Sequence, residues 1–247
     1  MKVRLILTFA FVCAVVFCSA QPASAILYGN RGDERGIQWV DGIADWKLEG
    51  VGGKVNADGT LTVSPGAERR GILMYQGGNN ADFMANYDVE TFVRKKKDGN
   101  YFALHARVNK PAKDFYLIEI SYGSNTVSTH ACKGGKFNEI TPGGNAGRPK
   151  RPEPKKLVGG DDTYTMKFEV KGDNIKYWID DVLMIATADK TWKTGPPGLG
   201  AQGTTMIYEW IRIDTIPPGR LGIQSTKKQL AVDSKSKLAV TWGRLKN

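Results

Sequence analysis

Polar side chains recur on one predicted face of three nearby segments of this 247-residue chain. The segments YDVETFVR, NYFALHARV and FYLIEISY alternate polar and apolar residues with period two, the pattern of a half-buried β-strand. If these strands are neighbours in one sheet, they bring together Glu90, Arg94, Tyr101, His105, Arg107 and Glu119. Charged groups bond directionally to hydroxyls, and an aromatic ring covers the apolar side of a pyranose. We therefore expect a carbohydrate-binding face.

An ordinary solvated sheet face has the same pattern. Exposed antiparallel strands carry charges of both signs, and a cross-strand ion pair such as Glu90 with Arg107 needs no ligand to explain it. Trp178 has two readings as well, because its ring either offers a platform to a sugar or covers the outer face of a second sheet. The expected carbohydrate-binding residues are Glu90, Arg94, Tyr101, His105, Arg107, Glu119 and Trp178, and no catalytic residue is assigned.

We expect no metal and no cofactor. His105 and His130 are the only histidines, whereas a zinc site needs about three or four His, Cys or acidic ligands. The pairs Asp161–Asp162 and Asp180–Asp181 stand among turn residues, where aspartate bonds to its own backbone. Neither pair belongs to a run that would supply the roughly six to eight oxygens that calcium takes. Cys132 lacks a legible activating histidine, so we interpret it as a small apolar strand residue.

The first 25 residues have the three parts of a secretory signal peptide. Lys2 and Arg4 are followed by the apolar stretch 5–17 and by the small-residue cleavage site Ala23-Ser24-Ala25. The apolar stretch is shorter than the roughly 20 residues of a membrane-spanning helix, and no later segment is apolar enough to span a membrane. We expect an exported protein, in the periplasm, on the cell surface or outside the cell. Its domains would be a signal peptide (1–25), a β-sandwich (26–215) and a C-terminal tail (216–247).

Positive charge is concentrated in one segment. Loss of Lys2 and Arg4 would lower the formal charge of +10 by two, and much of the remainder lies between Lys133 and Lys156. This segment is rich in proline and glycine, which predicts a long solvated loop. The loop either keeps the protein soluble or attracts an anionic polysaccharide by its long-range field. No nucleic-acid-binding motif is present, so we expect no nucleic-acid partner.

Short alternating segments separated by turn residues continue along the chain. The Asp58-Gly59 pair marks a hairpin between two of them, and Gly172-Asp173-Asn174 marks a turn within a later meander. No segment offers a sustained apolar helical face. Ten or so short strands of this kind indicate an all-β sandwich of two antiparallel sheets.

The meander KFEVKGDNIKYWIDDVLMIATAD and the following GPPGLGAQ carry the most specific pattern. They resemble the last strands of concanavalin A-like jelly-roll sandwiches, in particular the 3-keto-disaccharide hydrolase-like and laminin-G-like domains of bacterial exported proteins. In these families a glycine-rich segment precedes the closing strand, as Gly195, Gly198 and Leu199 do here. The resemblance implies a ligand on the concave sheet. The E-x-D-x-x-E motif of related glucanases is absent, and the segment Asp88 to Arg94 that comes nearest has one glutamate.

Three classes of function are compatible with these observations. The first is a carbohydrate-binding module that recognises a glycan on its concave sheet. The second is a glycan-processing hydrolase of the 3-keto-disaccharide type, in which Glu90 and Glu119 would have to approach to about 5–9 Å for ordinary glycosidase chemistry. The third is a structural or adhesion module that binds an anionic envelope polymer. Neither catalytic activity nor an oligomeric state is assigned from the sequence.

Overall fold

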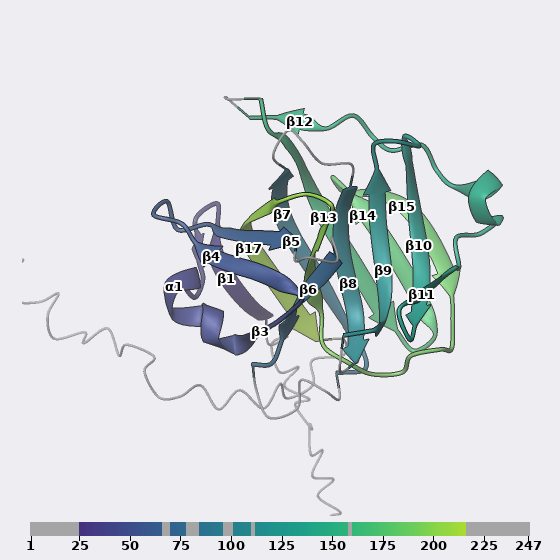
Figure 1. The fold of residues 1–247 in the computed structure, drawn as a ribbon, viewed down its shortest axis with the longest axis horizontal. Helices are drawn as coiled ribbons and strands as arrows, with labels where there is room; N and C mark the ends of the chain where they lie inside the picture. Colours follow the sequence, from purple (N-terminus) through teal and green to yellow (C-terminus); the bar gives the residue numbers. More distant parts are fainter. Residues whose placement is uncertain are drawn as a thin grey trace, which may run out of the picture.

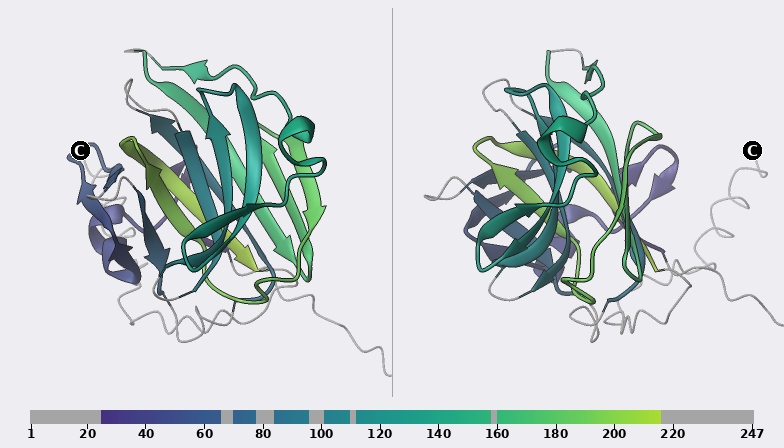
Figure 2. Two further views of the ribbon diagram at one scale, coloured as in Figure 1. Left: turned by 45° about the vertical axis from the view of Figure 1, so that its right-hand side comes forward. Right: turned by 90° about the vertical axis from the view of Figure 1, so that its right-hand side faces the viewer.

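The computed structural model describes residues 25–65, 70–77, 84–95, 101–109, 112–157 and 160–215. Two antiparallel sheets pack face to face, with a short helical segment at one side (Figures 1 and 2). The helical elements of this part of the chain are α1 (Trp39–Gly42), η1 (Ile43–Asp45) and η3 (Gly144–Gly147). The predicted all-β concanavalin A-like sandwich is confirmed.

The ten-stranded sheet has the order β15-β14-β13-β7-β17-β1-β2, with β12 beside β13, β5 beside β17 and β4 beside β5. Its strands are β1 (Ala25–Arg31), β2 (Glu34–Arg35), β4 (Val51–Val55), β5 (Leu61–Pro65), β7 (Tyr87–Lys95), β12 (Lys155–Lys156), β13 (Asp162–Lys171), β14 (Asn174–Ile179), β15 (Val182–Ala188) and β17 (Met206–Thr215). The predicted meander forms β13 to β15.

The seven-stranded sheet has the order β11-β10-β9-β8-β16-β6-β3 and lies in front in Figure 1. Its strands are β3 (Trp46–Glu49), β6 (Arg70–Tyr75), β8 (Tyr101–Asn109), β9 (Asp114–Ser121), β10 (Thr126–Lys133), β11 (Lys136–Glu139) and β16 (Gly198–Gln202). The expected strands are present, whereas the sequence pattern does not predict β1, β2, β3, β11, β12 or β16.

Alternation along the strands correctly predicts which side chains enter the core. Tyr87, Val89 and Val93 of β7 point inward, and so do Phe102, Leu104 and Ala106 of β8 with Tyr116, Ile118 and Ile120 of β9. Val108 is an exception, because a register shift between Ala106 and Asn109 reverses the alternation. Val108 instead joins a second apolar cluster, with Ile72 and Leu117, on the other face of the seven-stranded sheet.

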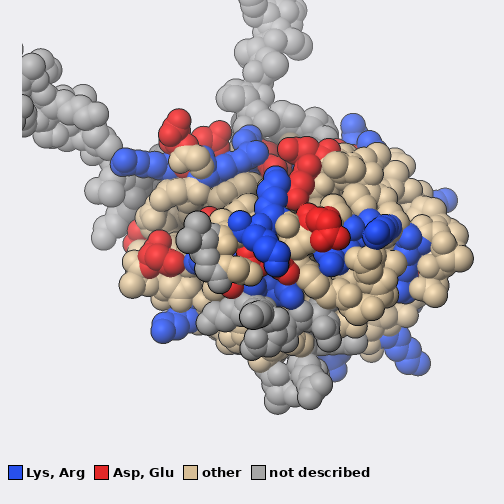
Figure 3. Space-filling model, turned by 90° about the horizontal axis from the view of Figure 1, so that it is seen from above, with Lys and Arg blue, Asp and Glu red and all other residues tan. Residues whose placement is uncertain are grey.

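The basic segment is more ordered than a solvated loop. Lys150 bridges to Thr126, so the segment lies along the edge of β10. Arg148 pairs with Glu139, Lys155 with Asp180 and Lys156 with Asp162. Figure 3, which looks onto the end of the sandwich that β12 crosses, shows blue side chains beside red ones. Three basic side chains of the segment are therefore paired with carboxylates, two of which belong to other parts of the chain.

The predicted signal peptide up to residue 24 and the predicted tail 216–247 lie outside the described residues. Ala25 is the first residue of β1, opposite Asp214 of β17. Among the described residues, no helix is both long and apolar enough to cross a bilayer.

Candidate functional site

The two sheets separate the residues that were expected to share one face. Glu90 and Arg94 belong to β7 of the ten-stranded sheet, whereas Tyr101, His105 and Glu119 belong to β8 and β9 of the seven-stranded sheet. The outward residues of the two sheets point away from each other because the core lies between them. The prediction of a single shared face is therefore wrong: β7 and β8 follow each other in the sequence but lie in different sheets.

Charged side chains compensate one another on the outer face of the ten-stranded sheet. Arg31 donates a hydrogen bond to Glu90 (3.3 Å), and the Lys167 ammonium lies 2.9 Å from Asp88. Lys167 also lies 5.6 Å from the centroid of the half-buried Trp178 ring. Burial raises the pKa of Asp88 and of Glu90. Paired, partly buried charges of this kind are ordinary sheet chemistry.

Arg94 also lies beside carboxylates. Its guanidinium lies 3.1 Å from the Asp58 carboxylate and 3.8 Å from that of Glu209. Trp178 lies half-buried on the outer face of the ten-stranded sheet, on β14. Glu90, Arg94 and Trp178 thus form no common site with Glu119.

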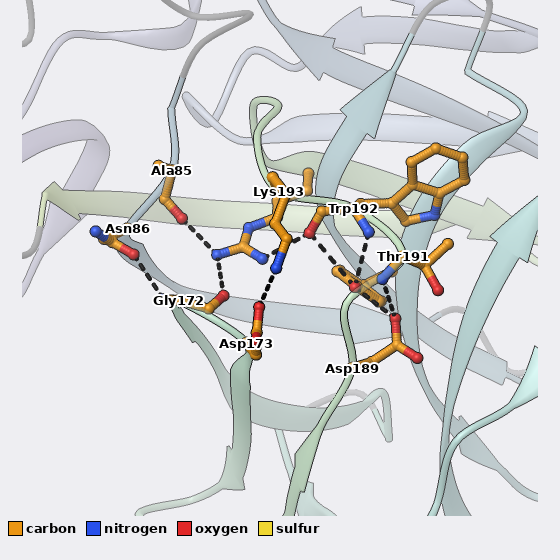
Figure 4. Close-up of polar contacts among 10 residues, drawn as sticks. Ala85, Asn86, Gly172, Asp173, Asp189, Thr191, Trp192 and Lys193 are labelled. Carbon is orange, nitrogen blue, oxygen red and sulfur yellow. Dashed lines mark hydrogen bonds and ion pairs between the residues drawn. The ribbon is translucent and has the colours of Figure 1, made fainter.

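Arg107 lies inside the protein instead of on a binding face. Its side chain is fully buried, and its backbone is left-handed, with φ of 48°. The guanidinium donates hydrogen bonds to the backbone carbonyls of Ala85 (2.6 Å), Gly172 (2.8 Å) and Trp192 (2.7 Å) (Figure 4). The Arg107 backbone N–H donates to the Tyr87 hydroxyl at 2.7 Å. Arg107 therefore joins three chain segments, and the expectation that it contacts a sugar is corrected by its burial.

Glu119 occupies the middle of the seven-stranded sheet. It lies directly opposite Ala103 of β8 and Ser128 of β10, and it is half-buried. Both neighbours are small, so the backbone on either side of this carboxylate carries little side-chain bulk. Tyr101, also half-buried, lies at the end of β8, opposite Ser121. This face retains Tyr101, His105 and Glu119 of the predicted residues.

His105 lies close to Glu119 on this face but is held down against the sheet. It pairs with Leu117 and Gly198, and its ring meets the Phe115 ring edge-on, 4.9 Å between centroids. Its side chain is only 5% exposed. Burial lowers the pKa of His105 to about 3, so the imidazole is uncharged at neutral pH.

An apolar cluster surrounds these polar groups. Ile72, Met74, Ala103, Phe115, Leu117 and Cys132 alternate with core residues and so belong to the outer face. The burial of Cys132 confirms its interpretation as a small apolar strand residue. Each of these six side chains is at most 6% exposed, so the cluster is packed within the protein beside the polar groups of this face.

Sequence reasoning missed a polar group at one edge of this face. The Ser128 hydroxyl lies 3.0 Å from Nε2 of His130, and His130 lies opposite Glu139. Arg148 donates two hydrogen bonds to Glu139, at 2.7 and 2.8 Å, and these bonds lower the pKa of that carboxyl. The Gly134-Gly135 turn was the available signal, because it indicates a hairpin that places Glu139 beside His130.

The described residues contain no cluster of three or more His, Cys, Asp or Glu side chains suited to a metal ion. Asp180 and Asp181 both have left-handed backbone, with φ of 47° and 66°, and form the turn between β14 and β15. Asp180 also accepts a hydrogen bond from the backbone N–H of Thr165 (2.9 Å). This pair of acids therefore serves the turn.

Solved structures with the same architecture include carbohydrate-binding proteins. Carbohydrate-binding module CBM66 from Bacillus subtilis is 18% identical, with a TM-score of 0.57 over 69% of this chain and 96% of the module. A Bacillus subtilis protein of unknown function with a galectin-like fold is 14% identical, with a TM-score of 0.50 over 70% of this chain and 90% of that protein. At such identities these similarities establish the fold alone.

A search of curated proteins found no significant match. The family model of the 3-keto-alpha-glucoside-1,2-lyase-like domain matches residues 36–231, which include nearly all of the described strands. The sequence resemblance to 3-keto-disaccharide hydrolase-like domains is thereby confirmed. The chain belongs to the 3-keto-alpha-glucoside-1,2-lyase-like domain family of concanavalin A-like, carbohydrate-related sandwiches.

Proposed function

We propose that this protein binds a 3-keto-α-glucoside on the outer face of its seven-stranded sheet. The observation that carries the proposal is the position of Glu119, a half-buried carboxylate between the small residues Ala103 and Ser128 and beside an apolar cluster. A carboxylate accepts hydrogen bonds from sugar hydroxyls. The family to which the chain belongs supports the keto-glucoside as the substrate class.

Processing of the bound sugar is a second candidate function, which the same carboxylate favours. A ketone at C3 makes the C2 hydrogen acidic, and Glu119 would act as the general base that takes this proton. The electron pair then forms the C1–C2 double bond while the C1–O bond breaks, and water protonates the leaving oxygen. A two-carboxylate mechanism with Glu90 is excluded, because Glu90 and Glu119 lie on opposite outer faces of the sandwich.

Binding of an anionic polymer has less support. Arg148 and Arg151 both have partners within the protein. Arg148 pairs with Glu139, and Arg151 donates a hydrogen bond to the Tyr164 hydroxyl at 3.1 Å. The Arg151 guanidinium also lies 4.2 Å from the centroid of the Tyr122 ring. The predicted leader would deliver the domain to the periplasm, the cell surface or the medium, which N-terminal sequencing of the protein recovered from these fractions would test.

NMR titration of the protein with methyl 3-keto-α-glucoside tests the proposed function, with methyl α-glucoside as the control sugar. We expect amide shifts in β8, β9 and β10 that persist from about 0.05 to 0.5 M salt, because a neutral sugar is not held by long-range charge. Methanol release in the same tube would show processing. Absence of shifts with both sugars, or shifts confined to the ten-stranded sheet, would contradict the proposal.

A further inference from the structure

Arg148 lies at the edge of the seven-stranded sheet, in line with Glu119. Lys150 forms an antiparallel bridge with Thr126 of β10, and this register places Arg148 beside Ser128, two residues further along. Ser128 in turn lies directly opposite Glu119. The backbones of Arg148 and Glu119 are therefore two strand spacings apart, about 10 Å. Side chains and one sugar ring can bridge such a separation.

A tight turn brings the chain back to this edge after β11 has ended at Glu139. A Cβ atom built on Gly147 would lie 1.9 Å from the carbonyl oxygen of Pro142, so only glycine permits this close approach. Arg148 follows directly and is thereby held next to β10.

The Arg148 guanidinium is fixed on the outer face of the sheet. Glu139 lies opposite His130, which faces outward because the next residue, Ala131, points into the core. Nε and Nη2 of Arg148 donate hydrogen bonds to the two carboxylate oxygens of Glu139, at 2.7 and 2.8 Å. This bidentate pair sets the plane of the guanidinium and leaves its other N–H groups for a further acceptor. The Arg148 side chain is 21% exposed, so a ligand can reach it.

Arg148 and Glu119 also interact through their charges. Hydrogen bonding to Glu139 raises the pKa of Arg148, and the negative charge of Glu119 adds to this effect. One face of the sheet thus holds a carboxylate that can take a proton and a fixed cation across Ser128 from it. Removal of a proton beside a ketone needs both groups, because negative charge develops on the carbonyl oxygen and must be stabilised.

We propose that Arg148 is a further catalytic residue, which donates a hydrogen bond to the C3 oxygen of the bound 3-keto-α-glucoside. This inference rests on the proposed processing of that sugar by Glu119. As Glu119 takes the C2 proton, the C–H electron pair forms a C2–C3 double bond, and the C3 carbonyl becomes an oxyanion beside the guanidinium. The carbonyl then re-forms, the electron pair moves to C1–C2 and the C1–O bond breaks. Arg148 keeps its own protons throughout.

Deuterium exchange at C2 measures the step that Arg148 would assist. The probe is 1,5-anhydro-3-keto-glucitol in D₂O, which has no leaving group at C1, so the reaction stops at the exchange of its C2 proton. Its C4 proton, acidified by the same ketone, is the internal reference. We expect Arg148→Gln to slow C2 exchange about 100-fold and to lower kcat for methanol release from methyl 3-keto-α-glucoside by a similar factor. KM should change less than about threefold, because the interaction strengthens only as the oxyanion forms.

Two further variants separate this role from charge alone. Lys150→Gln removes an exposed positive charge from the same segment and should exchange C2 within about twofold of wild type, because salt screens such a charge. Arg148→Lys keeps the charge but cannot form the bidentate pair with Glu139, so it should recover only part of the rate. If Arg148→Gln does not fold, the ¹³C signal of the C3 carbonyl decides, in sugar bound to Glu119→Gln. We expect this signal downfield of that of the free sugar, and an unchanged position would overturn the inference.

The outcomes distinguish the inference from the function on which it rests. If wild type exchanges the C2 proton and Arg148→Gln exchanges it equally fast, the inference is wrong and the proposed processing stands. If wild type binds the sugar but neither exchanges the proton nor releases methanol, the proposed processing fails and the inference falls with it, while the proposed binding stands. If wild type does not bind the sugar, the proposed function fails as a whole.

Discussion

His105 is an ionisable side chain that the fold keeps uncharged, and this gives the protein a specific pH dependence. Its folded pKa is about 3, against about 6.5 in an unfolded chain. Below pH 6.5 the unfolded chain therefore binds a proton that the folded protein does not. The free energy of unfolding should fall by about 1.4 kcal/mol per pH unit as the pH drops from about 6.5 towards 3.

Urea unfolding of wild type and His105→Phe at pH 7 and pH 5 measures this effect. The titration of carboxylates changes the free energy of unfolding of both proteins alike, so it largely cancels in the difference between wild type and variant. We expect wild type to lose about 2 kcal/mol relative to the variant between these pH values. A difference that does not change with pH would show that the imidazole is able to take up a proton in the folded protein.

At the same scale, alternation predicted side-chain direction for Glu119 but not for Arg107. Period two holds while a strand is regular, so Glu119, which lies between the inward Ile118 and Ile120, could be placed outward from sequence. Arg107 lies in a bulge, which breaks the period and turns the guanidinium into the protein. No residue type in NYFALHARVN signals this bulge.

At the scale of elements, the Arg107 guanidinium fixes three segments of chain at one end of the sandwich. These are the approach to β7 at Ala85, the β13–β14 turn at Gly172 and the segment after β15 at Trp192 (Figure 4). The last segment is also held by Tyr116, whose hydroxyl accepts from the Trp192 N–H at 3.0 Å and donates to Asp189 at 2.7 Å. Arg107 is thus a structural residue of the fold.

Arg107→Gln should destabilise the protein by about 3 kcal/mol, because it leaves buried carbonyl groups without donors. Arg94→Gln is the matched control: it removes a partly exposed ion pair and should cost less than about 1 kcal/mol. Denaturant unfolding measures both. Equal losses for the two variants would contradict the assigned role of Arg107.

Hairpins were predictable from the sequence and sheet membership was not. The turns at Asp58-Gly59 and Gly172-Asp173-Asn174 carry local signals, and both lie between paired strands. Consecutive strands usually pair, which is why β7 and β8 were expected to be neighbours. Here β7 pairs with β13 and β17, far along the chain, and such long-range choices leave no local mark in the sequence.

At the scale of the whole molecule, the two outer faces have different chemistry. The ten-stranded sheet carries compensated charges, as in the Arg31–Glu90 and Lys167–Asp88 pairs. The seven-stranded sheet carries an apolar cluster with Glu119 and an uncharged histidine. We assign the ligand to the second face because there the half-buried Glu119 lies between the small residues Ala103 and Ser128.

Two glutamate variants test this assignment most directly, because their parent residues lie on β-strands of opposite faces. We predict that Glu119→Gln weakens binding of methyl 3-keto-α-glucoside about tenfold in calorimetric titration, since an amide replaces a charged acceptor. Glu90→Gln should bind within about twofold of wild type. Loss of binding in Glu90→Gln together with unchanged binding in Glu119→Gln would contradict the account and place the ligand on the ten-stranded sheet.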